Sequence, residues 1–122
     1  MADRLHYLGP HDALRLDLAC RPLVEAFGTA PVLVGSALAR PDYRDVDVRL
    51  VVSDDRYREL FGGSELLARL ISCALSDWLG RASGLPVDFQ VRSAAAAAAY
   101  TGPSVPLGTR TYAAVRWTDS DR

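Results

Sequence analysis

The sequence contains no lysine, so all 14 of its basic residues are arginines. They are balanced by 15 acidic residues, and the formal net charge is −1. A chain with so little net charge has no overall positive field to attract nucleic acid non-specifically. Any recognition of phosphate by this protein must therefore use arginine guanidinium groups, which bind phosphate oxygens in pairs.

Cysteine is also scarce, because Cys20 and Cys73 are the two in the chain and they fit no metal-binding spacing. Each lies in an apolar stretch of helical character, where an unpaired cysteine acts as a small hydrophobic residue. No apolar run approaches the roughly 18 residues of a membrane-spanning helix, and the N-terminus lacks the apolar region of a signal peptide. These absences predict a cytoplasmic protein with no membrane segment.

The size and composition of the chain are those of one globular domain: 122 residues, 49% hydrophobic and 24% charged. We expect this domain to span residues 1–102, with a motif-bearing core at residues 32–91. Residues 103–122, which begin among glycines and prolines, are expected to form a partly disordered C-terminal tail or edge strand. The segment Thr111–Trp117 is the candidate for that strand.

Hydrophobic periodicity predicts alternating helices and short strands. The first helix is expected to begin at Asp12 as N-cap and end at Gly28, with Pro22 kinking or splitting it. The other expected elements are strands at 32–35, 44–52 and 87–91 and helices at 56–61, 64–82 and 94–99. This order predicts an α/β (α+β) fold, in which a mixed sheet of three to four strands carries helices on one face.

The same patterns predict which side chains pack between the sheet and its longest helix. The strand side of this core is expected to consist of Val46, Val48, Leu50, Val87, Phe89 and Val91. The helix side is expected to consist of Leu67, Leu70, Ile71, Leu75 and Trp78. The opposite face of the sheet is then open.

Gly35-Ser36 follows the apolar strand that starts at Val32. A glycine at such a strand end lets the backbone approach a ligand closely, and a serine offers a hydroxyl and an N–H to a phosphate oxygen. Arg40 and Arg44 follow closely and would lie near such a phosphate. Taken alone, the Gly-Ser pair is equally compatible with a simple turn.

Three carboxylates are placed on otherwise apolar strands. Asp45 and Asp47 are two positions apart, so both point to the same face of the second strand. Such a pair costs stability unless a cation or hydrogen bonds compensate, which suggests a divalent metal ion. Asp88 on the third strand joins them if that strand pairs beside the second.

Together, Gly35-Ser36, an eight-residue spacer, Asp45-Val46-Asp47-Val48 and the later Asp88 resemble the minimal nucleotidyltransferase domain of the DNA polymerase β superfamily. The sequence segments around these residues, Gly35 to Val48 and Gly84 to Gln90, also resemble segments of small nucleotidyltransferase-like proteins of actinobacteria and their phages. The resemblance covers residues 32–91.

The resemblance implies roles for individual residues. Gly35 and Ser36 would hold the β- and γ-phosphates of a nucleoside triphosphate. Asp45, Asp47 and Asp88 would bind two Mg²⁺ ions, and Asp88 would also help to activate the attacking hydroxyl. The reaction would attach a nucleoside monophosphate to a hydroxyl of an acceptor. The acceptor would be a protein side chain, an RNA end or a small molecule. The chain would act as a homodimer or with a partner protein.

Two other interpretations remain open on the same residues. The spacer is slightly shorter than is usual in the family, and Arg49 shares the face of Asp45 and Asp47. We also expect no second domain that would bind an acceptor. Arg49 is thus in a position to pair with a carboxylate and replace a metal ion, which favours a non-catalytic module that binds a nucleotide or a protein. In the third interpretation, the carboxylates merely solvate the edge of a sheet.

Overall fold

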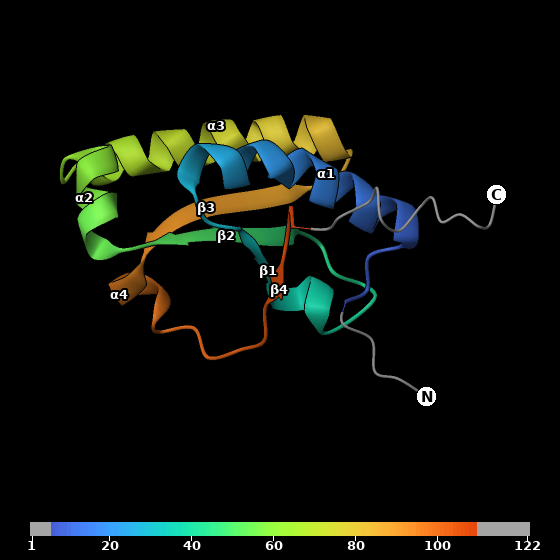
Figure 1. The fold of residues 1–122 in the computed structure, drawn as a ribbon. Coiled ribbons are helices and arrows are strands. Elements are labelled where there is room, and N and C mark those ends of the chain that lie inside the picture. The colour runs from blue at the N-terminus through green and yellow to red at the C-terminus, as the bar shows by residue number, and fades with distance from the viewer. Residues whose placement is uncertain (1–5, 110–122) are drawn as a thin grey trace.

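The computed structural model describes residues 6–109, and the expected strand Thr111–Trp117 lies outside that range. Four strands form one sheet in the order β3-β2-β1-β4 (Figure 1). They are β1 (Val32–Val34), β2 (Val46–Val52), β3 (Val87–Ser93) and β4 (Val105–Pro106). Since β1 is antiparallel to β2 and β4 while β2 is parallel to β3, the sheet is mixed, and the predicted fold class is confirmed.

The central strand β2 has the alternation that its sequence predicts. Val46, Val48, Leu50 and Val52 are buried, whereas Asp47, Arg49 and Val51 are half-buried on the opposite face. Phe89 and Val91 of the adjacent β3 are buried with the valines of β2. One face of the sheet therefore carries the core and the other carries the polar side chains.

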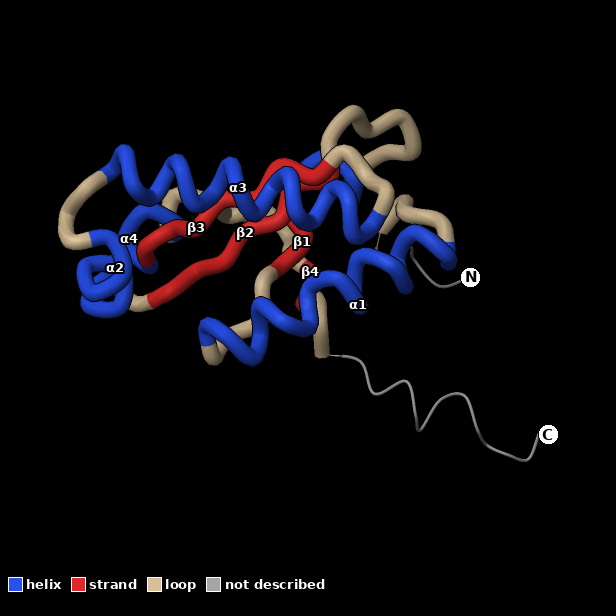
Figure 2. Tube along the Cα trace, turned by 90° about the horizontal axis from the view of Figure 1, so that it is seen from above, coloured by secondary structure: helices blue, strands red, loops and turns tan. Residues whose placement is uncertain are grey.

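Two long helices, α1 (Pro10–Phe27) and α3 (Glu65–Ser83), lie side by side on the apolar face of the sheet (Figures 1 and 2). The shorter α2 (Asp54–Phe61) leads from β2 into α3. The 3-10 helix η1 (Gly35–Leu38) joins β1 to β2, and α4 (Ala94–Ala97) follows β3. Figure 1 shows α4 on the side of the sheet away from α1 and α3.

Helix α1 differs from its prediction at two prolines. It begins at Pro10 after Gly9, not at an Asp12 cap, since a proline in the first turn has no N–H that needs a partner. It also continues through Pro22, so the expected split does not occur. Because Pro22 has no N–H, the helix lacks the hydrogen bond that residue 22 would donate to the carbonyl four residues earlier. Pro22 is exposed, so water can donate to that carbonyl instead.

Helix α3 presents a different face to the sheet from the one predicted. Leu67, Leu70 and Trp78 are 40%, 58% and 41% exposed, whereas Ala68, Leu79 and Ser83 are buried. Ile71 and Leu75 pack against the core as expected. The inward face also includes two serines, which a search for an apolar stripe passes over.

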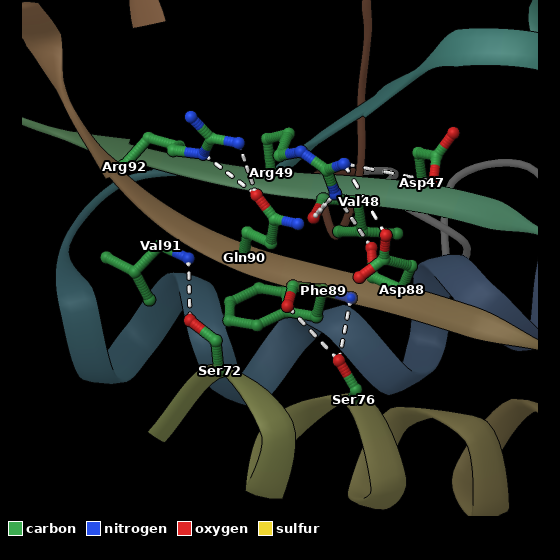
Figure 3. Close-up of polar contacts among 10 residues, drawn as sticks. All are labelled: Asp47, Val48, Arg49, Ser72, Ser76, Asp88, Phe89, Gln90, Val91 and Arg92. Atoms are coloured by element: carbon green, nitrogen blue, oxygen red, sulfur yellow. Dashed lines mark hydrogen bonds and ion pairs between the residues drawn. The ribbon is translucent and has the colours of Figure 1, made fainter. Parts of the chain in front are cut away.

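Those serines, Ser72 and Ser76, bind the free edge of β3 (Figure 3). The Ser76 hydroxyl accepts the N–H of Phe89 at 2.8 Å and donates to the carbonyl of Phe89 at 3.1 Å. The Ser72 hydroxyl accepts the N–H of Val91 at 3.1 Å. The helix thus supplies the partners that a neighbouring strand would supply, and this requirement rotates α3 away from its most apolar stripe.

The segment expected to be a C-terminal tail or an edge strand forms an edge strand at β4 and is packed onto the domain up to Gly108. β4 pairs with β1, and Leu107 is 5% exposed. The backbone N–H of Gly108 donates to Oδ1 of Asp17, which is 2% exposed, at 2.7 Å. Gly108 has a φ of +79°, and a β-carbon there would lie 3.1 Å from the backbone of Cys20. Glycine is therefore required where the chain passes over α1.

The two cysteines are free, and they differ in environment. Cys20 is buried, which raises its pKa to about 12 with a further contribution from Asp17, whereas Cys73 is exposed. Cys20 thus behaves as the predicted small hydrophobic residue. Among residues 6–109, no helix is long and apolar enough to span a bilayer.

We expect Ser76→Ala to lower the free energy of unfolding by about 1–3 kcal/mol, because the N–H and carbonyl of Phe89 both lose their partner. Ser72→Ala, which removes one hydrogen bond, is expected to cost less. Urea denaturation measures both changes. Cys73→Ala on the exposed side of the same helix is the control and should stay within about 0.5 kcal/mol of the wild type. A Ser76→Ala protein as stable as this control would contradict the account of the β3 edge.

Candidate functional site

The turn after β1 packs directly on the carboxylate of Asp47. Val34 and Asp47 are partners in the antiparallel register, so Gly35 lies beside the Asp47 side chain. Gly35 has a φ of +81°, and a β-carbon there would overlap with Oδ2 of Asp47 and lie 3.2 Å from its Cγ. Glycine is needed here both for backbone conformation and for space. The two halves of the Gly-Ser and Asp-Val-Asp motif thus meet in the fold.

The parallel pairing of β2 and β3 places Asp88 directly opposite Asp47. The guanidinium of Arg49 pairs with both carboxylates (Figure 3). Its Nη2 is 3.8 Å from Oδ1 of Asp47 and 3.7 Å from Oδ2 of Asp88, and its Nη1 donates to the carbonyls of Asp88 at 2.8 Å and Val48 at 3.0 Å. The predicted pairing of Arg49 with a carboxylate is confirmed, and it extends to both aspartates.

Asp47 is held in an environment that disfavours its charge. Burial raises its pKa above the usual value, Arg49 acts in the opposite direction, and the negative charges of Asp88 and Asp45 raise it further. The net direction is upward, so Arg49 compensates only in part. A second positive charge near Asp47 would therefore be stabilising.

A cavity of about 560 Å³ opens over this face of the sheet. Its volume is within the range of about 300–1,000 Å³ that is typical of small-molecule sites. The polar part of its lining includes Gly35, Asp47, Arg49 and Arg92, and the rest is formed by valines of β1 and β2 and by the alanine-rich segment around α4. Tyr100, which follows α4, completes the wall. The cavity thus joins an acidic group, two cations and an apolar surface.

Not all the residues predicted for the site lie in this cavity. Asp45 is exposed one residue before β2 and is near enough to Asp47 to raise its pKa. The backbone carbonyl of Ser36 accepts the N–H groups of Ala39 and Arg40, which closes the turn of η1. Arg40 pairs with Asp42 at 3.5 Å, and Arg40 and Arg44 are both exposed outside the cavity lining. The structure therefore brings together Gly35, Asp47 and Asp88, although Asp88 is not among the residues that line the cavity. It leaves the two predicted arginines on the surface.

Arg92 and Tyr100 line the cavity but were not predicted from the sequence. The strand containing Arg92 was expected to end at residue 91, whereas β3 continues to Ser93 and carries Arg92 along the sheet. Arg92 donates two hydrogen bonds, from Nε at 2.8 Å and Nη2 at 2.5 Å, to Oε1 of Gln90. Extending the alternation of β3 by two residues would have found Arg92, but no periodicity marks Tyr100.

The donor chemistry of the site fits a hard divalent cation only in part. Carboxylate oxygens such as those of Asp47 and Asp88 are the ligands that Mg²⁺ prefers. Within residues 6–109, however, no three acidic, histidine or cysteine side chains are gathered as a metal-binding group. Arg49 pairs with both aspartates, so its positive charge already offsets part of the negative charge that a metal ion would offset.

Gly35→Ala should be more damaging than the same change at Gly63, which has the same φ of +81° but open space around it. We expect Gly63→Ala to cost about 1–2 kcal/mol of backbone strain alone. Gly35→Ala adds the overlap with Asp47 and should exceed that cost by at least about 1 kcal/mol. Urea denaturation compares the two variants. Equal losses would mean that the turn is not packed on Asp47.

The raised pKa of Asp47 means that the native state holds this proton more tightly than the unfolded chain does. The proton bound to Asp47 therefore adds to the free energy of unfolding below the usual carboxyl pKa. This contribution is lost as the pH rises through the raised pKa of Asp47. We therefore expect Asp47→Asn to raise the free energy of unfolding at pH 7, with a gain that shrinks towards pH 4. Asp42→Asn, at a carboxylate that is 84% exposed, is the control for urea denaturation at both pH values. A less stable Asp47→Asn protein at pH 7 would contradict the assignment.

Comparison of the chain with protein-family models, curated proteins and solved structures finds no match in any of the three.

Proposed function

We propose that this protein is a metal-dependent nucleotidyltransferase that moves a nucleoside monophosphate from a nucleoside triphosphate to a hydroxyl group. One observation carries the proposal: Asp47 and Asp88 lie opposite each other on parallel strands, and the Gly35 turn packs on Asp47 at the wall of a cavity. The resemblance of the motif to the DNA polymerase β superfamily requires these three parts to meet. Their arrangement was not imposed by sequence proximity, since 40 residues separate Asp47 from Asp88.

In the proposed reaction, the oxygen of the acceptor hydroxyl attacks the α-phosphorus and forms a new P–O bond. The bond from the α-phosphorus to the oxygen that bridges it to the β-phosphate breaks, and pyrophosphate leaves with that electron pair. The hydroxyl proton passes to the carboxylate of Asp88 or to water. Arg49 and Arg92 face the same cavity and would bind phosphate oxygens through their guanidinium groups.

Asp47 and Asp88 would hold Mg²⁺, with Asp45 beside them, and the bound cation would neutralise charge on the phosphate oxygens. The raised pKa of Asp47 supports this assignment, because a carboxylate that is short of positive charge gains from a cation. Arg49 would then have to share its two aspartates with the ion. The guanidinium keeps its hydrogen bonds to two backbone carbonyls, which do not depend on those carboxylates.

The acceptor and the setting belong to this proposal as well. We propose a protein side chain, an RNA end or a small molecule as the class of acceptor, and a homodimer or a complex with a partner protein as the working form. A nucleoside triphosphate and Mg²⁺ are both cytosolic reactants, in agreement with the proposed cytoplasmic location.

A second function is favoured by the position of Arg49. Its guanidinium already supplies a positive charge to both aspartates, at 3.8 and 3.7 Å, as a metal ion would. A non-catalytic module that binds a nucleotide without Mg²⁺ would need no other cation there. The two functions differ in whether nucleotide binding depends on Mg²⁺ and on the carboxylates.

Calorimetric titration with a nonhydrolysable nucleoside triphosphate, with and without Mg²⁺, separates them. For a transferase, we expect Mg²⁺-dependent binding that weakens at least about tenfold in Asp47→Asn and in Asp88→Asn, since each removes a charged ligand of the bound cation. Asp42→Asn, outside the cavity, should bind as the wild type does. Binding that ignores both Mg²⁺ and the two substitutions would favour the non-catalytic module. The absence of binding would overturn both functions for the isolated chain.

A further inference from the structure

We infer that Tyr100 is a stacking platform for the base of the bound nucleotide, and that the site holds this base without reading its hydrogen-bonding edge. The inference rests on the proposed function, because it takes a nucleotide as the occupant of the cavity. It adds the element that binds the base and a prediction about which nucleotides are accepted.

Tyr100 is fixed in place although it is exposed. Tyr100 lines the cavity, and 45% of the residue is accessible to solvent. Its hydroxyl donates to the carbonyl of Pro103 at 2.5 Å, so the polar end of the ring already has its partner. A β-carbon on Gly102 would lie 2.5 Å from the Tyr100 hydroxyl oxygen and 2.7 Å from Cζ, so glycine is what allows the turn to close around the ring. A preordered aromatic ring loses little entropy when a ligand stacks on it.

The wall on either side of Tyr100 is apolar. Ala96, Ala97 and Ala99 line the cavity before it in the chain, and Val32 and Val51 line it from the sheet. These alanine and valine side chains have no hydrogen-bonding groups. Among the lining residues, Tyr100 and Ser104 carry the hydroxyl groups. Planar bases stack on aromatic rings whatever their edge pattern. This wall thus suits a base but offers little to tell one purine from another.

The charged groups of the cavity lie on the strands. Asp47 and Arg49 are on β2 and Arg92 is on β3, whereas Tyr100 belongs to the segment that follows α4. The charged groups of the cavity are therefore confined to the sheet, where they lie among valines of β1 and β2, and the segment around α4 adds alanines and an aromatic ring. A nucleotide likewise combines charged phosphates with an aromatic base. An inorganic polyphosphate would use the charged groups alone, and this difference provides the test.

The test is calorimetric titration, in the presence of Mg²⁺, with three probes: nonhydrolysable ATP, nonhydrolysable GTP and inorganic tripolyphosphate. We expect the two nucleotides to bind the wild type within about threefold of each other. Tyr100→Ala should weaken both by about tenfold or more and leave tripolyphosphate binding unchanged. Tyr100→Phe should keep most of the affinity, because the ring remains. Trp78→Ala, which removes an exposed aromatic residue from α3, is the matched control.

Gly102→Ala provides a second variant that retains the tyrosine, and it should weaken nucleotide binding by displacing the ring. Circular dichroism of each variant checks that the fold is intact. The inference is overturned if Tyr100→Ala binds the nucleotides as the wild type does, or if tripolyphosphate binding falls by the same factor. A preference of the wild type for one purine above tenfold would overturn the part concerning the base edge. If the wild type binds none of the three probes, the proposed function fails and this inference fails with it.

Discussion

The parallel pairing of β2 with β3 is the constraint on which the rest of the site depends. It sets Asp47 opposite Asp88 at one level of the sheet, on the face away from α1 and α3. Two carboxylates at this separation are unfavourable without a positive charge between them, and the chain supplies one from Arg49, two residues farther along β2. Because side chains alternate along a strand, the same geometry that exposes Asp47 to this face also brings Arg49 to it.

Arg49 gives the site two distinct uses. As an ion-pair partner it stabilises the acidic pair in the absence of any ligand. As a cation that lines a cavity it is also available to phosphate under the proposed function, and a bound phosphate would compete with the aspartates for the guanidinium. The upward shift of the Asp47 pKa indicates that the present arrangement is only partly compensated. A site balanced in this way responds to an added cation or anion more readily than one in which every charge is fully paired.

The sequence was most informative where a single physical requirement acts on an element. β2 must bury one face, and its alternation of valine with polar residues predicted both the buried side and the positions of Asp47 and Arg49. α3 must satisfy two requirements, and its serines serve the β3 edge at the expense of Leu70 and Trp78, so the apolar stripe gave the wrong face. The place of Tyr100 depends on a turn around Gly102 and on a cavity formed by distant strands, neither of which has a local pattern.

The serines of α3 also affect whether another chain can pair with the β3 edge of the sheet. A sheet usually offers its outer strands as templates for a further strand, which leads to strand exchange or aggregation. Here the backbone groups of Phe89 and the N–H of Val91 are already bonded to side chains of a helix, and the opposite edge is a two-residue strand that contains a proline. Recruitment of a strand at either edge is thus disfavoured. Any homodimer or complex should therefore be joined through side-chain surfaces of helices and loops, which leaves both edges of the sheet out of the contact.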